Sequence, residues 1–193
     1  KFLGAFKGND KILIIYKSGE YRLAPFDLGL HFDEDMIHVE KWYPARPISA
    51  VYFDGEKEMY YVKRFLCEVT TDKKVCFITE TEGSELSVVS TAYKPIAKII
   101  YNKLLKATKN LPDTEVALED FIDVKGMKAQ GNQLTKLKVK EIVLNHAIEG
   151  NEPWPEPEKK FVEKSTDAED DEDDQTDTEE ADSEGGSNTV EWD

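Results

Sequence analysis

The chain has 193 residues, enough for one domain with a hydrophobic core, and a formal net charge of −15. Residues 163–193 hold 15 acidic residues and one basic residue, which leaves 25 acidic and 24 basic residues in 1–162. No apolar run approaches the roughly 20 residues of a membrane span, and residues 1–15 lack the apolar region of a signal peptide. Because the chain begins at Lys1 without a Met, we expect it to be a fragment of a longer protein or a processed product.

The cysteines and histidines argue against a metal site. Cys67 and Cys76 lie in apolar, strand-like runs and are predicted to be reduced, buried thiols, as in a cytoplasmic protein. His31, His38 and His146 are far apart in sequence, whereas a structural zinc needs about four ligands. We therefore expect neither a metal nor a cofactor in this chain.

Strand patterns begin near the N-terminus. Residues 11–16 (KILIIY) and 21–26 flank a Lys-Ser-Gly-Glu turn, which predicts a β-hairpin. Residues 36–42 (MIHVEKW) alternate apolar and polar side chains, which predicts a half-buried strand.

Two further hairpins are predicted in the middle of the chain. Residues 48–53 and 59–69 flank Asp-Gly-Glu-Lys, and residues 74–79 and 86–91 flank Glu-Gly-Ser. Turn residues between apolar runs therefore recur along the sequence.

The next element is ambiguous from its pattern. Residues 96–101 fit helical spacing and a strand equally well, and we favour a strand because the neighbouring elements are β. Residues 104–114 form a polar connection, and residues 116–124 and 134–144 are predicted as strands on either side of a glycine-containing turn.

The basic segment, residues 121–139 (FIDVKGMKAQGNQLTKLKV), is the first candidate binding element. Gly126 and Gly131 are predicted turn residues, where glycine allows a positive φ that a Cβ would oppose. Four lysines lie around them: Lys125, Lys128, Lys136 and Lys138. A basic turn between strands is suited to offer charge to a phosphate backbone.

Hairpins recur about every 40 to 50 residues, which is the period of a blade-type repeat. Three units can be drawn, at about 1–45, 46–92 and 93–148. Their self-similarity is weak, so the pattern alone leaves an ordinary antiparallel sandwich or meander as an equal alternative.

The C-terminal part differs in composition. Alternating prolines in residues 149–162 predict an extended linker. Residues 163–193 are rich in Asp, Glu, Ser and Thr, cannot bury enough apolar surface, and are predicted to be a disordered acidic tail. We expect Trp192 to have no specific role at this terminus, with a docking anchor as the alternative.

Residues 1–148 resemble the C-terminal domain of the A subunit of bacterial type IIA DNA topoisomerases, the subunit of DNA gyrase and topoisomerase IV. Four segments carry the resemblance. They are DKILIIYKSGEYRL (10–23), DMIHVEKW (35–42), ISAVYFDGEKEMYYVKRF (48–65) and, above all, DFIDVKGMKAQGNQLTKLKVKEI (120–142).

The resemblance implies an all-β fold, a β-pinwheel of propeller-like blades that exchange strands. About three blades would lie in 1–148, followed by the linker and tail. It also implies a basic rim that binds and bends duplex DNA and presents it to the strand-passage core. The implied partners are duplex DNA, the rest of the A subunit and the ATPase subunit, with no membrane, in the cytoplasm on the bacterial chromosome.

Two departures from the family motifs refine this expectation. The Gln-Arg-Arg-Gly-Gly-Lys-Gly box of the gyrase subunit is not in the sequence, which favours a topoisomerase IV-like bending role. No Arg-Tyr dipeptide, the pair that attacks DNA in the core of these enzymes, occurs either. The resemblance therefore implies no catalysis by this chain, whereas the parent enzyme is an ATP-dependent isomerase that uses ATP and Mg²⁺ elsewhere.

The predicted DNA contacts are basic residues early in second strands or in the basic segment, together with Arg46 between two predicted strands. They are Lys125, Lys128, Lys136, Lys138, Arg22, Arg46, Lys63 and Arg64. For each residue, the alternative is that it lies on a solvated face without contacting DNA. For Arg64, a further alternative is an ion pair with Glu68. The neutral charge of 1–162 requires that folding gather these cations on one rim.

Two other functions fit parts of the sequence. A β scaffold whose acidic tail binds a basic partner would be a protein-interaction module without DNA contact. A hydrolase on a β-propeller is the weakest reading, because we find no nucleophile–base pair and no Gly-rich phosphate loop. The tail itself supports a further hypothesis, in which its charge of −14 competes with DNA for the basic rim.

Overall fold

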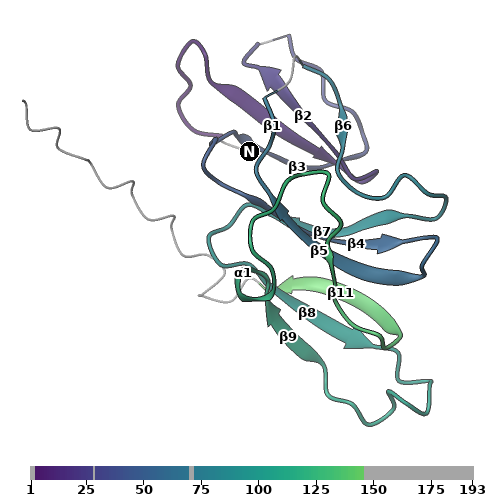
Figure 1. The fold of residues 1–193 in the computed structure, drawn as a ribbon. Helices are drawn as coiled ribbons and strands as arrows, with labels where there is room; N and C mark the ends of the chain where they lie inside the picture. The colour runs from purple at the N-terminus through teal and green to yellow at the C-terminus, as the bar shows by residue number, and fades with distance from the viewer. Residues whose placement is uncertain (1–2, 28, 70–71, 146–193) are drawn as a thin grey trace, which may run out of the picture. The chain divides into compact units, whose positions relative to one another are not determined.

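The computed structural model describes residues 3–27, 29–69 and 72–145, all in the first of two compact units, residues 1–156. The predicted linker, acidic tail and Trp192 lie outside the described residues. The described chain forms three antiparallel sheets and one short helix (Figure 1). The all-β prediction is therefore confirmed, with about three blades as expected.

The first sheet contains the predicted N-terminal hairpin. Strands β1 (Lys11–Tyr16) and β2 (Glu20–Pro25) pair with each other, and β3 (Met36–Lys41) lies on the other side of β1. The turn between β1 and β2 uses Gly19 at a φ of +80°. A Cβ there would also lie 2.4 Å from the Ile78 side chain, so the turn requires glycine for two reasons.

The second sheet is built on the predicted hairpin of β4 (Ile48–Asp54) and β5 (Met59–Phe65). Strand β7 (Glu85–Ser90) pairs with the other edge of β4. The short strand β10 (Asn132–Gln133) pairs with β5, which gives the order β10-β5-β4-β7.

The third sheet has the order β11-β8-β9. Strand β8 (Ile96–Tyr101) confirms the choice of strand over helix, and it lies between β9 (Thr114–Ala117) and β11 (Val139–Asn145). The helix α1 (Leu118–Phe121) follows β9 directly. The predicted strand 116–124 is therefore wrong after Ala117, where the chain turns so that Leu118 and Ile122 both enter the core.

Strands are exchanged between sheets. Strand β6 (Val75–Cys76) pairs with β2 of the first sheet, so the predicted hairpin of 74–79 with 86–91 is wrong. Likewise, the predicted strand 134–144 is confirmed only from residue 139 on, as β11 of the third sheet, and residues 132–133 before it form β10 in the second sheet. In both cases a two-residue strand completes the preceding sheet, because the free edge of β2 or β5 offers backbone partners there.

The second sheet is buried on both faces. Ile48, Ala50 and Tyr52 of β4 belong to a core cluster shared with the first sheet, whereas Val51 faces a cluster shared with the third sheet. A strand covered on both sides reads as a nearly continuous apolar run, as ISAVYF does. Full burial of each such side chain contributes about 1.5–3 kcal/mol.

The two cysteines are free thiols, as predicted. Cys67 is buried in the core, which raises its pKa to about 12, while Cys76 is half-buried. Neither environment favours a reactive thiolate at neutral pH.

The two predicted turn glycines have different roles from the expected one. Neither Gly126 nor Gly131 is among the described glycines with a positive φ. A Cβ on Gly126 would meet no atom within 4 Å, but one on Gly131 would lie 2.2 Å from the Val62 carbonyl oxygen. Gly131 is therefore needed because β10 begins in close contact with the backbone of β5.

The substitution Gly131→Ala should destabilise the fold by about 1–3 kcal/mol, because either β10 or β5 must shift to admit the methyl group. Gly126→Ala is the matched control and should change the free energy of unfolding by no more than about 0.5 kcal/mol. Urea unfolding of the two variants measures the difference. Equal stability of both would contradict the close contact.

Candidate nucleic-acid interface

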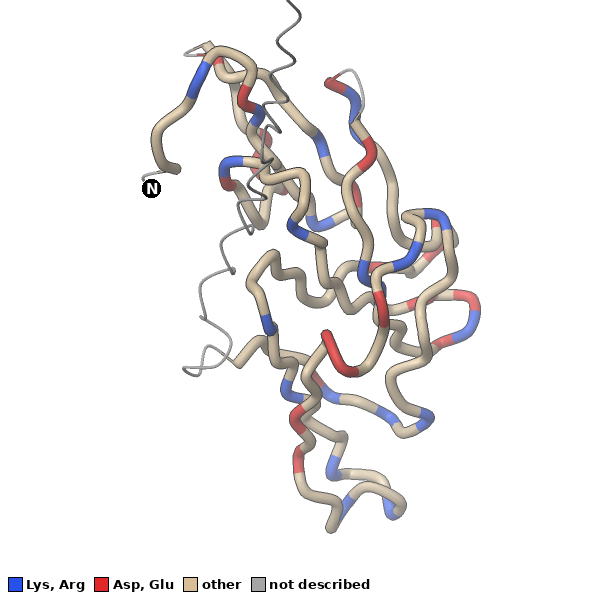
Figure 2. The backbone as a smooth tube through the Cα atoms, turned by 60° about the vertical axis from the view of Figure 1, so that its left-hand side comes forward, with Lys and Arg blue, Asp and Glu red and all other residues tan. Residues whose placement is uncertain are grey.

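The basic residues of the body are concentrated in two stretches of sequence. Residues 86–112 contain five lysines and residues 124–140 another five, and neither stretch contains an acidic residue. The fold brings the stretches together, because β8 pairs with β11 and the Asn102 amide donates to the Lys138 carbonyl at 3.1 Å. Blue positions accordingly follow the lower part of the tube in Figure 2.

Lys63 lies inside the protein. Its side chain is 7% exposed, and its Nζ donates to the carbonyl oxygens of Phe77 at 2.5 Å and Met127 at 2.7 Å. Burial lowers the pKa of this ammonium group. A side chain in this position cannot reach a phosphate, so we withdraw Lys63 from the predicted DNA contacts.

Arg64 is also removed from the predicted DNA contacts, because it too is only 7% exposed. Its Nε donates to the Ser49 hydroxyl at 3.2 Å, and its Nη1 donates to the carbonyls of Glu119 at 3.4 Å and Ile122 at 3.3 Å. These partners also replace the alternative pairing with Glu68.

The two buried cations instead fix the backbone of the basic segment. Between them they bind three carbonyl groups from residues 119–127, and the Arg64 carbonyl accepts from the Lys125 amide at 2.8 Å. Met127 is 4% exposed in the core between the first and second sheets. The turn therefore has a buried anchor on each side.

Two lysines of this anchored turn remain at the surface. Lys125 and Lys128 are both exposed, and Lys125 Nζ donates to the Asn132 side-chain carbonyl at 3.2 Å. This contact orients Lys125 without neutralising its charge. Both positions therefore stay available to an anion.

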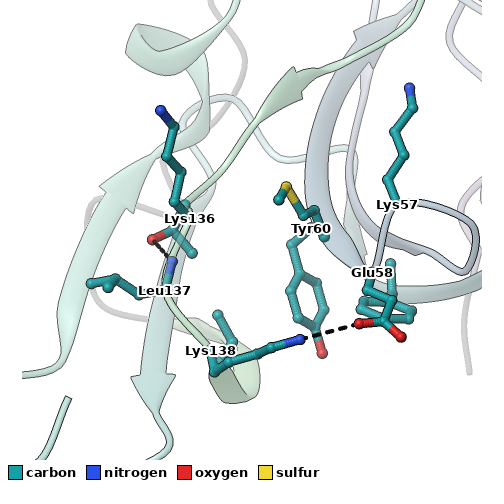
Figure 3. Close-up of a pocket in the computed structure, with 10 residues that line it drawn as sticks. Lys57, Glu58, Tyr60, Lys136, Leu137 and Lys138 are labelled. Atoms are coloured by element: carbon teal, nitrogen blue, oxygen red, sulfur yellow. Dashed lines mark hydrogen bonds and ion pairs between the residues drawn. The ribbon is translucent and has the colours of Figure 1, made fainter. Parts of the chain in front are cut away.

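Lys136 and Lys138 line one pocket together with Lys57 (Figure 3). The pocket, of about 190 Å³, lies between the end of the β4–β5 turn and the chain that leads into β11. Lys57 and Lys136 extend in the same direction from its two sides in Figure 3. Lys138 crosses it to Glu58, with a Nζ–Oε2 distance of 3.5 Å. Glu58 thus pairs with Lys138, whereas the Lys57 and Lys136 side chains point away from it in Figure 3.

The remaining two predicted contacts lie apart from this pocket and already have partners. Arg22 forms a bidentate pair with Asp72, at 2.6 and 3.0 Å, which lowers the pKa of that carboxyl group. The Arg46 guanidinium lies 3.8 Å from the centre of the Tyr43 ring. The structure therefore brings together Lys136 and Lys138, but it does not gather all eight predicted residues.

The sequence analysis missed the lysines of the loop between β8 and β9. We call residues 102–113 the lysine loop; Lys103, Lys106 and Lys109 are exposed on it, and Lys140 is exposed in β11. The sequence feature that points to these lysines is the absence of Asp and Glu from residues 86–112, which a count of charge along the chain would have found.

Other kinds of site find little support in the described residues. They contain no group of three or more His, Cys, Asp and Glu side chains placed to hold a metal ion. No helix among them has the length and apolar character needed to cross a membrane.

The described residues define a strand-exchanging β-blade domain with exposed lysines around its third sheet. The family model described as topoisomerase C-terminal domain, Bacteroidota, matches residues 1–147, and the chain belongs to this family. No curated protein matches the chain.

The Lys63→Met substitution tests the buried anchor, because it keeps the apolar stem and removes the ammonium group. It should destabilise the protein by roughly 1–3 kcal/mol, since the carbonyls of Phe77 and Met127 lose their donor. Hydrogen exchange at the Lys125 amide should also accelerate. Lys128→Met, at an exposed position, is the control, and the anchor is refuted if both variants match the parent in urea unfolding and in exchange.

Proposed function

We propose that this chain is the DNA-binding and DNA-bending C-terminal domain of a type IIA topoisomerase A subunit. The family membership supports the topoisomerase part of the proposal. The observation that carries the DNA part is the convergence of two acid-free, lysine-containing stretches at the third sheet. In this proposal, the convergence gives a near-neutral body a locally basic surface.

The proposed contacts are exposed lysines of the basic segment and the lysine loop. Each ammonium group would neutralise a phosphate and release a counterion, without reading base sequence. The bent duplex would then be presented to the strand-passage core of the parent enzyme. In this proposal the chain binds and positions DNA, while ATP and Mg²⁺ act in other parts of the enzyme.

The same proposal sets the partners and the location. The chain would work with the rest of the A subunit and with the ATPase subunit, in the bacterial cytoplasm on chromosomal DNA. The missing Gln-Arg-Arg-Gly-Gly-Lys-Gly box supports bending of the topoisomerase IV kind over the tight wrapping of gyrase.

Removing charge from the anchored turn should weaken DNA binding. For Lys125→Gln/Lys128→Gln, Kd for a ~40-base-pair duplex should rise several-fold, and the slope of log K against log[salt] should shrink by up to about two. Lys17→Gln/Lys73→Gln, two exposed lysines outside both stretches, is the matched control with the same change in net charge. Fluorescence anisotropy at several salt concentrations measures both quantities.

Two outcomes would contradict this assignment. Equal losses in the two double variants would mean that net charge, and not this surface, determines binding. No binding by the parent chain at low salt would remove autonomous DNA binding and favour the protein-interaction module.

The acidic tail provides a separate test. If residues 163–193 compete with DNA for the lysines, a chain ending at Glu158 should bind the duplex more tightly than the full chain. The difference should be largest at low salt, because screening weakens the competition between exposed charges. Unchanged affinity at low salt would leave the tail without this role.

A further inference from the structure

The lysine loop carries the most exposed large apolar side chain of the described residues. Leu104 is 92% exposed, whereas the other exposed large apolar residues range from 36% to 68%. It lies between Lys103 and Lys106, early in the connection between β8 and β9. A leucine held almost wholly in water gives nothing to the stability of the fold.

The loop is nevertheless well ordered by its own hydrogen bonds. Successive turns join Asn102 to Leu105, Leu105 to Thr108 and Thr108 to Leu111. The Asn102 side chain accepts from the Leu104 amide at 3.0 Å, so the backbone at the leucine is fixed. The loop therefore presents Leu104 on a defined backbone.

Buried and paired groups close the base of the loop. Thr108 is 1% exposed, and its hydroxyl donates to the Asn102 carbonyl. Lys103 pairs with Asp113 at 2.9 Å, which lowers the pKa of that carboxyl group. Leu111 packs against the core cluster of the third sheet.

Two cations beside Leu104 remain unneutralised. Lys106 and Lys109 are exposed, and in the described part of the chain no carboxylate oxygen lies within 4 Å of either ammonium group. Lys103 is already committed to Asp113. The lysine loop thus combines one exposed leucine with two available positive charges.

We propose that the lysine loop is a wedge that opens a base step of duplex DNA. Leu104 would enter between adjacent base pairs from the minor groove, while Lys106 and Lys109 contact the flanking phosphates. An apolar wedge inserted in this way unstacks one step and kinks the duplex. The inference rests on the proposed DNA-binding function and assigns the bend to a particular side chain.

The chemistry of the loop favours DNA over a lipid surface. One leucine, with Leu105 41% exposed beside it, offers too little apolar area for stable insertion into a bilayer. A base step needs only one rigid apolar side chain, and the surrounding lysines match the phosphates on both strands.

The test uses a duplex with 2-aminopurine beside a flexible TA step, because fluorescence of this base rises when it unstacks. Binding of the parent chain should raise the fluorescence, and Leu104→Ala and Leu104→Gln should abolish that rise. Affinity of these variants should fall by no more than about tenfold, with an unchanged salt slope, because no phosphate contact is lost. Leu66→Ala, at another exposed leucine, is the control and should behave as the parent chain.

Lys106→Gln/Lys109→Gln should have the opposite effect to the Leu104 variants: the salt dependence should change and the unstacking should remain. Its salt slope should shrink by up to about two, whereas saturating protein should still unstack the base. Salt-dependent binding without any fluorescence rise in the parent chain would overturn the wedge and leave the proposed function standing. Absence of any duplex binding by the parent chain would remove both the wedge and the proposed function. Leu104-dependent pelleting with phosphatidylserine vesicles, without unstacking, would assign the loop to membranes and overturn the inference.

Discussion

The buried ammonium group of Lys63 is the contact on which the arrangement of the second sheet depends. It binds a carbonyl from the chain beyond β6 and another from the basic segment, which are 50 residues apart in sequence. Arg64, the next residue of β5, holds the same segment from its other end. A charge removed from water in this way is tolerated because several oxygen atoms replace its hydration.

The exchange of strands makes the first and second sheets each depend on the unit that follows it. The first sheet is completed by β6 and the second by β10, so neither is complete within its own repeat. Lys63 holds a carbonyl of the chain that follows β6, and both cations hold carbonyls of the chain that precedes β10. The exposed lysines of the basic segment therefore depend for their positions on two buried cations of the neighbouring strand β5.

The sequence predicted the local elements better than their partners. The hairpins around Gly19 and Gly55 were evident because apolar runs flank turn residues. The two-residue strands β6 and β10 were not, since such short segments have no periodicity and their partners lie far away in sequence.

For the candidate site too, local features were predicted better than long-range packing. The sequence predicts Lys63 and Arg64 as surface cations because an alternating strand has one solvated face, whereas β5 is covered on both sides from Tyr61 to Phe65. Strand exchange also sets the order in which the first and second sheets are completed during protein synthesis. The edge of β2 stays open until residues 75–76 have left the ribosome, and the edge of β5 until residues 132–133 have. Each open edge is a site where a nascent chain can pair wrongly, so the most vulnerable interval belongs to β5, which waits longest.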